Sequence, residues 1–354
     1  MKKPRVDYFR SPVEGIVPGE AKSIYGLVES FSRLSFQGRN LGEAAAIWRK
    51  MLEAEATIFL GLAGALVPAG FRTMVRYLIE NRLIDCLVST GANIFHDVHE
   101  TLGGRHWKGS VRADDAKLFE AGVDRIYDTF ASEREFRRTE KRIAAVARGL
   151  KATHPYTTRE FLEFLGKELK KEARAPGIVT TAAEHGTPVF CPAVADSSIG
   201  MALDICRYKW GKRFIIDVIG DVTETGAIMR NSGQTGVIYL GGGTPKNFIQ
   251  QASLVPSKRM NVFFSHDYAI QVTADMPQWG GLSGCTFEEA KSWGKIGVDA
   301  RQVTVNCDAT IAFPLLVSAI AEELPNIKTG KRPRFEWTGD RKRPVRIKYV
   351  PRRS

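Results

Sequence analysis

The sequence predicts an α/β protein built on a doubly wound, mostly parallel sheet with a helical insertion. Short apolar runs of strand length recur along the chain, several end in glycine or aspartate, and stretches with helical spacing separate them. Alternation of strand, turn and helix is typical of a doubly wound fold. In such folds, ligands gather where the strands end, so the residues after each run are candidate site residues.

Seven apolar runs are the candidate strands, and most of them are expected to be parallel. They cover residues 57–60, 84–90, 188–191, 214–216, 236–240, 268–273 and 302–306. Runs that are apolar throughout are typical of parallel strands buried on both faces. Helices are expected at 41–54, 68–81 and 94–101, among others. Residues 41–325 are therefore predicted to form one α/β domain rather than two independent domains.

Three other segments differ in character from this domain. Residues 1–40 are predicted to be an N-terminal arm, with helical spacing at 24–34. The segment at about 103–177 is predicted to be a helical insertion with helices at 132–148 and 157–172. Residues 326–354 form a basic tail with eleven Lys or Arg and two acidic residues. We expect a mainly solvated tail, although Phe335, Trp337 and Tyr349 could pack part of it; binding to nucleic acid or an acidic partner is the alternative.

Composition narrows the class of protein. The chain has 354 residues, 44% of them hydrophobic, and a net charge of +12. No apolar run approaches the roughly 20 residues that span a bilayer, and the first residues lack the apolar core of a signal peptide. We therefore expect a soluble, cytoplasmic protein. The five cysteines are odd in number and show no CxxC spacing, which favours free thiols.

The segment 283–300 contains the candidate nucleophile, Lys295. Thr286 and Glu289 have the spacing of a capping box that begins a short helix at 287–292, and Gly294 is placed to end it. Lys295 would then project beside Trp293. A desolvated, neutral lysine can attack a carbonyl or imine carbon. The alternative is an ordinary surface lysine after a helix end, and spacing alone favours that alternative.

Glycines and aspartates after the predicted strands are candidate ligand-binding residues. Residues 241–243 are three glycines, and Thr244 is expected to cap the helix that follows. Helix N-termini beside glycines can hold a phosphate, although the motif is not GxGxxG and could be only a tight turn. The turn at Thr90 and Gly91 also follows a strand. Asp196 and Asp308 could accept from ribose hydroxyls or merely cap helices.

The pair His96 and His99 has metal-ligand spacing on a predicted helix. No third ligand follows at a fixed short spacing, and HExxH is absent. We therefore expect no metal here, and expect His96 to be hydrogen-bonded near the turn at 89–93.

Several motifs together resemble the deoxyhypusine synthase family. They are Ser-Trp-Gly-Lys-Ile at 292–296, Val-Asp-Ala at 298–300, Asp-Ala-Thr at 308–310 and Phe-Pro-Leu-Leu at 313–316. Leu-Gly-Gly-Gly at 240–243, Pro-Lys at 245–246, Pro-Ala at 192–193, Phe-Leu-Gly at 59–61 and Ser-Thr-Gly-Ala at 89–92 resemble the same family. The resemblance extends from about residue 45 to about 320.

This resemblance implies a Rossmann-like fold that binds NAD. The matching positions place the cofactor against Thr90, Gly91, Asp196, Gly242, Gly243, Ser283, Asp308 and Ala309. Lys295 matches the lysine that carries a four-carbon fragment of spermidine as an imine. Trp293 would then line the alkyl chain, and Glu289 would bind an amine end. The family also implies a homotetramer with active sites at dimer interfaces, and an N-terminal arm that covers a neighbour's entrance.

The amine-binding residues depart from the family pattern. His96, Met201 and Leu282 stand where acids are expected, Asn247 replaces a histidine, and Gln251 replaces an asparagine. Fewer carboxylates mean weaker attraction for a polycation, so the donor or the acceptor could differ. His96, Asn247 and Gln251 are therefore candidate substrate-binding residues. The departures resemble the bacterial deoxyhypusine synthase-like group.

We therefore expect an NAD-dependent transferase that moves a 4-aminobutyl group from spermidine or a related polyamine to an amine acceptor. The acceptor could be a protein lysine, or a small amine such as putrescine, which would make the protein a homospermidine synthase. An amine dehydrogenase is disfavoured because the family recycles its cofactor. A non-enzymatic nucleic-acid-binding protein that uses the basic tail is the alternative from another class. We disfavour contact with nucleic acid and expect none with a membrane.

Overall fold

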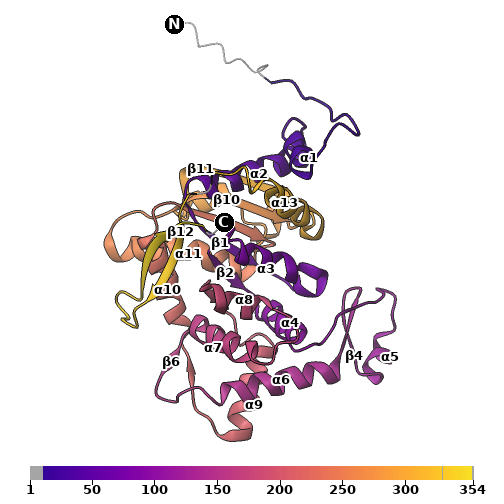
Figure 1. Ribbon diagram of the computed structural model, residues 1–354, viewed down its shortest axis with the longest axis vertical. Coiled ribbons are helices and arrows are strands. Elements are labelled where there is room, and N and C mark those ends of the chain that lie inside the picture. Colours follow the sequence, from indigo (N-terminus) through magenta and orange to yellow (C-terminus); the bar gives the residue numbers. More distant parts are fainter. Residues whose placement is uncertain (1–10, 329, 353–354) are drawn as a thin grey trace.

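The computed structural model describes residues 11–328 and 330–352, and its centre is a six-stranded sheet (Figure 1). The strands are β1 (Thr57–Leu62), β2 (Cys86–Ser89), β7 (Val189–Phe190), β9 (Thr235–Leu240), β10 (His266–Thr273) and β11 (Ile296–Asn306). Every neighbouring pair is parallel, in the spatial order β11-β10-β9-β1-β2-β7. The predicted α/β fold with a mostly parallel sheet is confirmed. Chain order reverses between β1 and β9, and such a switch point opens a crevice at the carboxyl ends of the strands.

Both faces of the sheet are covered because side chains along each strand alternate between two cores. Ile58 and Leu60 face one core, whereas Phe59 and Tyr239 face the other. The first core contains residues of α2 (Phe36–Glu53), α3 (Arg72–Glu80) and α13 (Ala309–Glu323). The second contains residues of α10 (Val218–Asn231), α11 (Gly243–Met260) and α12 (Phe287–Ser292). The sheet is thus wound on both sides, and its central strands β1 and β9 are buried along their whole length, whereas the edge strand β11 is partly exposed.

The insertion contains more than the predicted helices. Helices α6 (Glu133–Ala147) and α7 (Thr158–Lys170) confirm the two that were expected. A three-stranded antiparallel sheet was missed: β3 (Trp107–Lys108), β4 (Val123–Ile126) and β5 (Thr129–Ser132), with α5 (Asp115–Glu120) beside it. These strands are short and only partly buried, so they carry little apolar signal. In Figure 1, α5, β4 and α6 lie at the opposite end of the molecule from α1 (Ile24–Phe31).

One predicted strand does not belong to the central sheet. Within residues 214–216, β8 (Ile215–Ile216) pairs only with β6 (Pro155–Tyr156), in a separate two-stranded sheet. The prediction placed it in the main sheet because its isoleucines are apolar, but Ile215 is exposed. The remaining elements are a π-helical turn at Val67–Phe71, α4 (Gly91–Thr101), α8 (Ile178–His185), α9 (Ser198–Trp210) and a 3₁₀ turn at Pro277–Trp279.

Part of the basic C-terminal segment packs on the body through Phe335, Trp337 and Tyr349, as the sequence allowed, whereas residues 338–343 are exposed. The expectation of a mainly solvated segment was wrong for the strands that carry these aromatic residues. Strands β12 (Arg332–Trp337) and β13 (Val345–Val350) form an antiparallel hairpin. Arg332 is fully buried and donates to the carboxylate of Asp85, immediately before β2. The Asn231 side chain donates to the Val345 carbonyl at 2.9 Å. These partners place the hairpin at the amino ends of the strands, and Figure 1 shows the hairpin beside the sheet.

The predicted N-terminal arm is only partly within the described residues, because positions 1–10 lie outside them. In its described part, α1 packs against α2 and α13. No helix among residues 11–328 and 330–352 has the length and apolar character needed to span a membrane.

Candidate active site

The local geometry around Lys295 follows the sequence prediction. The Thr286 hydroxyl accepts from the Glu289 amide at 3.0 Å, and the Glu289 carboxylate accepts from the Thr286 amide at 3.4 Å. The helix ends after Ser292, and Gly294 adopts a left-handed conformation with φ of 71°. Gly294 therefore reverses the chain, and Lys295 leads directly into β11.

The amine of Lys295 lies between Trp293 and α11. Its Nζ donates to Asn247 Oδ1 at 3.2 Å and lies 5.2 Å from the centre of the Trp293 ring. This groups three predicted site residues. Trp293 is 65% exposed, so the ring that was expected to line the alkyl chain is open to solvent in the single chain. A flat aromatic face beside an amine can hold the alkyl chain and ammonium groups of a polyamine.

The other predicted substrate residues are less closely grouped. Glu289 is exposed and held by its capping box, and Gln251 is an exposed residue of α11. His96 is buried elsewhere: its Nδ1 lies 2.9 Å from His106 Nε2, and its ring packs edge-on against Phe136 of α6. Burial holds the pKa of His96 at about 3, so it is uncharged at neutral pH. Its contacts are with the insertion and not with Lys295.

The glycine loop meets the segment that leads to Lys295. Ser283 Oγ accepts from the Gly243 amide at 3.1 Å. A Cβ on Gly242 would lie 2.4 Å from Ser283 Cα, so this approach needs glycine at that position. Helix α11 begins at Gly243, with Gly242 at its cap, so the expectation that Thr244 caps the helix was wrong. Gly242 has no side chain to cap this helix, and Ser283 Oγ takes the first amide, that of Gly243. Pro245 has no amide hydrogen and the Lys246 amide donates to the Gly242 carbonyl, so the Thr244 amide is the first-turn donor that a ligand could use.

The remaining predicted cofactor residues follow β2, β7 and β11 at the same edge of the sheet. Thr90 caps α4, and its hydroxyl donates to the Gly64 carbonyl at 2.7 Å. Gly91 packs tightly against Ser197, next to Asp196. The Asp196 carboxylate is exposed. Asp308 caps α13 by accepting from the Thr310 amide at 2.6 Å, and Ala309 is the first residue of that helix.

Comparison with known proteins identifies the family. The deoxyhypusine synthase family model matches residues 26–320. The chain belongs to the deoxyhypusine synthase family. Its membership makes it an enzyme, a transferase, and implies aminobutyl transfer from spermidine. The resemblance to this family seen in the sequence is thereby confirmed.

Named relatives cover nearly the whole chain. "Probable deoxyhypusine synthase 2" of Methanosarcina mazei is 49% identical over 90% of this chain and 92% of its own length. The protein of the same name in Archaeoglobus fulgidus is 50% identical over 86% of this chain and 99% of its own. The "deoxyhypusine synthase-like protein" of Chlorobaculum parvum is 36% identical, over 88% and 90%. A crystal structure described as a "putative deoxyhypusine synthase from Entamoeba histolytica" shares the fold, with TM-score 0.61, 20% identity, and coverage of 90% and 98%.

Two buried polar residues of this deoxyhypusine synthase family member were missed as site residues from the sequence. Lys246 and Gln271 are each only 1% exposed, and Lys246 Nζ donates to Gln271 Oε1 at 2.8 Å and to the Cys285 carbonyl at 2.5 Å. Burial lowers the pKa of Lys246 to about 8. A glutamine inside the apolar run at 268–273 was the available signal, because a polar side chain in a central strand must find buried partners.

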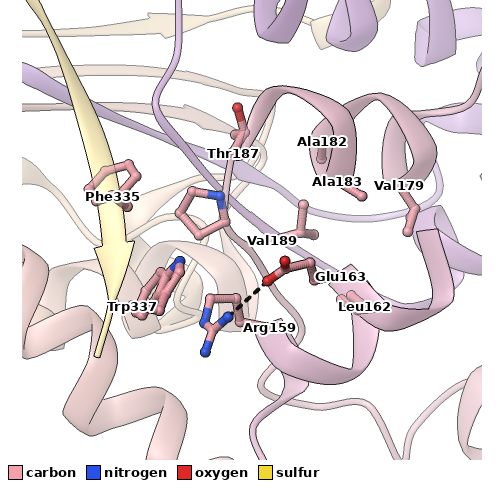
Figure 2. A pocket seen from close by; sticks show the side chains of 12 residues that line it. Arg159, Leu162, Glu163, Val179, Ala182, Ala183, Thr187, Val189, Phe335 and Trp337 are labelled. Atoms are coloured by element: carbon pink, nitrogen blue, oxygen red, sulfur yellow. Dashed lines mark hydrogen bonds and ion pairs between the residues drawn. The ribbon is translucent and has the colours of Figure 1, made fainter. Parts of the chain in front are cut away.

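The cavity drawn in Figure 2 lies away from Lys295. It holds about 140 Å³ and is enclosed by α7, α8 and the hairpin strand β12. Arg159 stacks on Trp337 at 3.7 Å, and both line this cavity. Pro188 and Val189 line it at the amino end of β7, on the other edge of the sheet from the glycine loop. The cavity therefore belongs to the packing of the hairpin.

Proposed function

We propose that this protein is an NAD-dependent aminobutyl transferase of the deoxyhypusine synthase type, with Lys295 as the covalent nucleophile. The observation that carries the proposal is the position of the Lys295 amine. It is hydrogen-bonded to Asn247 on α11, about one helical turn from the glycine loop that begins the same helix. A nucleophile and a candidate cofactor loop are thus supported by one rigid element.

The residues at the carboxyl edge of the sheet fit NAD. The strand order matches the order 3-2-1-4-5-6 of dinucleotide-binding folds, and Gly241–Gly243 follows β9 at the switch point. The N-terminus of α11, where the glycine loop leaves the Thr244 amide for a ligand, suits a diphosphate. The exposed carboxylates of Asp196 and Asp308 suit ribose hydroxyls. Thr90, Gly91, Ser283 and Ala309 would complete the surroundings of the cofactor.

The proposed chemistry assigns a distinct role to each residue. NAD, when bound, would accept a hydride from the carbon beside the secondary nitrogen of spermidine and would later return it. Lys295 Nζ would form a bond to that oxidised carbon while its bond to the original nitrogen breaks and diaminopropane leaves, so the four-carbon fragment becomes an imine of Lys295. Asn247 orients the amine, Trp293 packs on the alkyl chain, and Glu289 accepts from its terminal ammonium. An acceptor amine then displaces Lys295 before the carbon is reduced again.

Covalent trapping tests the role of Lys295. Borohydride added during turnover with spermidine and NAD should reduce the imine and leave a four-carbon adduct on Lys295, detectable by peptide mass. Lys295→Ala should abolish transfer and keep NAD binding. Lys295→Arg should also fail, because a guanidinium stays charged and cannot act as the nucleophile.

Lys291 provides the matched control because it lies four residues before Lys295, in the last turn of α12. Its Nζ is held by Glu288 at 2.8 Å, which agrees with the prediction that it pairs with neighbouring acids. Lys291→Ala should therefore keep transfer activity. An adduct mapped to Lys291, or full activity in Lys295→Ala, would end the proposal. Product masses with protein and small-amine acceptors would separate deoxyhypusine synthesis from homospermidine synthesis.

A further inference from the structure

Gln271 joins the two segments that the proposed reaction must hold together. Its Nε2 donates to the Gly241 carbonyl at 2.9 Å and to the Ser283 carbonyl at 2.8 Å. Its Oε1 accepts from Lys246 Nζ at 2.8 Å. Both amide hydrogens and the amide oxygen are therefore used. The amide orientation follows from chemistry, because the reverse orientation would place oxygen against two carbonyl oxygens.

The contacts of Gln271 lie beneath a seam between two backbone segments. One side is the glycine loop, and the other is Ser283–Cys285, which leads into α12 and Lys295. Across the seam, the Gly243 amide donates to Ser283 Oγ at 3.1 Å. Ser283 approaches Gly242 so closely that any side chain there would force the segments apart. The two segments are thus joined by the close glycine contact, by the Gln271 amide and by Lys246, whose Nζ also donates to the Cys285 carbonyl.

We propose that Gln271 is a positioning residue that sets the separation between the glycine loop and the segment carrying Lys295. The backbone of the glycine loop makes one hydrogen bond to Ser283, from the Gly243 amide. Gln271, in contrast, donates to a carbonyl on each of the two segments. Without its amide, the two carbonyls lose their buried donors, and relieving that loss requires water to enter or the segments to move. The effect on turnover rests on the proposed function: if the two segments move apart, Lys295 is misplaced relative to the carbon that it attacks.

Gln271→Met tests the proposal, because methionine has a similar unbranched shape and no amide. Gln271→Glu is the companion variant: it keeps an acceptor for Lys246 and loses both donors to the carbonyls. Ile270→Ala is the matched control, since it lies on the same strand, faces the other core and lowers stability without touching the seam. Hydrogen exchange of the amides at 241–246 and 283–286 is the first measurement.

Both Gln271 variants should speed exchange in these two segments by about tenfold or more, as expected when a buried hydrogen bond is lost. In Ile270→Ala, exchange at 241–246 and 283–286 should change only in proportion to exchange in β1, so the ratio of the two rates should equal that of the parent. Gly242→Ala, which opens the seam from the other side, should reproduce the Gln271 pattern. Equal exchange in Gln271→Met and Ile270→Ala would overturn the proposal. This measurement needs no cofactor, so it decides the matter even if the parent protein fails to bind NAD.

Turnover gives the second measurement. If Lys295 forms the covalent imine, Gln271→Met should lower kcat by about tenfold or more while polyamine KM changes little, because misplacement of reacting groups affects the chemical step. Ile270→Ala at a temperature where it is fully folded should keep kcat. A loss confined to KM, or an equal loss in the control, would contradict a positioning role. An inactive parent would refute the proposed function and leave the exchange result standing.

Discussion

Lys246 shows how a buried charge makes stability depend on pH. Its usual pKa of 10.5 falls to about 8 in the folded protein, chiefly because burial disfavours the ammonium form. Below about pH 8 the Lys246 amine is protonated in both the folded and the unfolded protein, and folding then has to bury its charge. Between pH 8 and 10.5 the unfolded state binds more protons, so the free energy of unfolding rises with pH. The neutral amine can still donate to both of its partners.

Lys246→Met should remove this dependence. The stability of the variant relative to the parent should fall by roughly 3 kcal/mol as pH rises from 8 to 10.5, at about 1.4 kcal/mol per pKa unit. Urea unfolding of the variant and the parent at several pH values measures the difference between their free energies of unfolding. Groups other than Lys246 titrate in both proteins, so their contributions cancel in this difference. A difference that stays constant over this interval would show that Lys246 titrates normally.

Asp308 has two separable roles. Its carboxylate caps α13 through the Thr310 amide, and we propose that it also contacts NAD. Asp308→Ala should cost about 1 kcal/mol of stability through the lost cap and weaken NAD binding by about 1–3 kcal/mol. Asp308→Asn keeps a capping oxygen and removes the charge, so it should restore stability but not NAD affinity. Calorimetric titration with NAD distinguishes the roles, and unchanged affinity in both variants would remove Asp308 from the site.

Sequence signals located the Lys295 turn because its determinants are local. Thr286, Glu289 and Gly294 lie within nine residues and specify where the helix begins and ends. The Lys246–Gln271 contact could not be found in that way, because its members lie on different elements and are brought together only by packing of α11 on the sheet. His96 illustrates the same limit: its partner His106 follows an irregular segment whose path the sequence does not reveal.

At the scale of elements, the C-terminal hairpin depends on a buried ion pair. Arg332 Nη2 bonds to Asp85, and Asp85 also accepts from the Ile58 amide at 2.8 Å. Arg332→Met should destabilise the protein by about 3–5 kcal/mol, because it leaves a carboxylate without its charged partner. The double variant Arg332→Met with Asp85→Asn should recover part of this loss. Urea unfolding of the parent, the two single variants and the double variant gives the coupling free energy between Arg332 and Asp85. Losses that simply add would show that the two side chains do not interact.

This hairpin changes how the basic residues should be tested for binding to nucleic acid. Deleting residues 327–354 would remove Arg332 and the hairpin packing together with the charges. Neutral substitutions at the exposed Arg334 and Arg346 avoid that complication, because both face solvent and neither forms an ion pair within the described part of the chain.

Elements of the central sheet were predictable because buried parallel strands are apolar throughout. The run at 57–60 became β1, fully buried along its length. Residues 214–216 have a similar composition but are too short and exposed to join that sheet. The hairpin was missed because its strands alternate outward cations with inward apolar residues such as Phe335 and Ile347, and a high net charge conceals that alternation.

At the scale of the whole molecule, exposed apolar side chains lie on the segments around Lys295. Trp279 is 71% exposed and Val298 81%, and Trp293 belongs to the same stretch of chain. We predict a homotetramer in which a partner chain lies close to Lys295, as proposed from the family resemblance. Light scattering should give the tetramer mass, and Val298→Glu should shift it toward smaller, less active species. An active monomer would contradict this prediction.

The Arg332–Asp85 contact has a consequence for synthesis of the chain. The two residues are 247 positions apart, so Asp85 emerges from the ribosome on the order of 10–50 s before its partner, at the usual rate of elongation. Throughout that interval the amino edge of the nascent sheet lacks the hairpin and the Arg332 guanidinium that bonds to Asp85. The domain can complete its core only after residues 332–350 have been synthesised, and products of translation interrupted before them should be recognised as unfinished by chaperones and proteases.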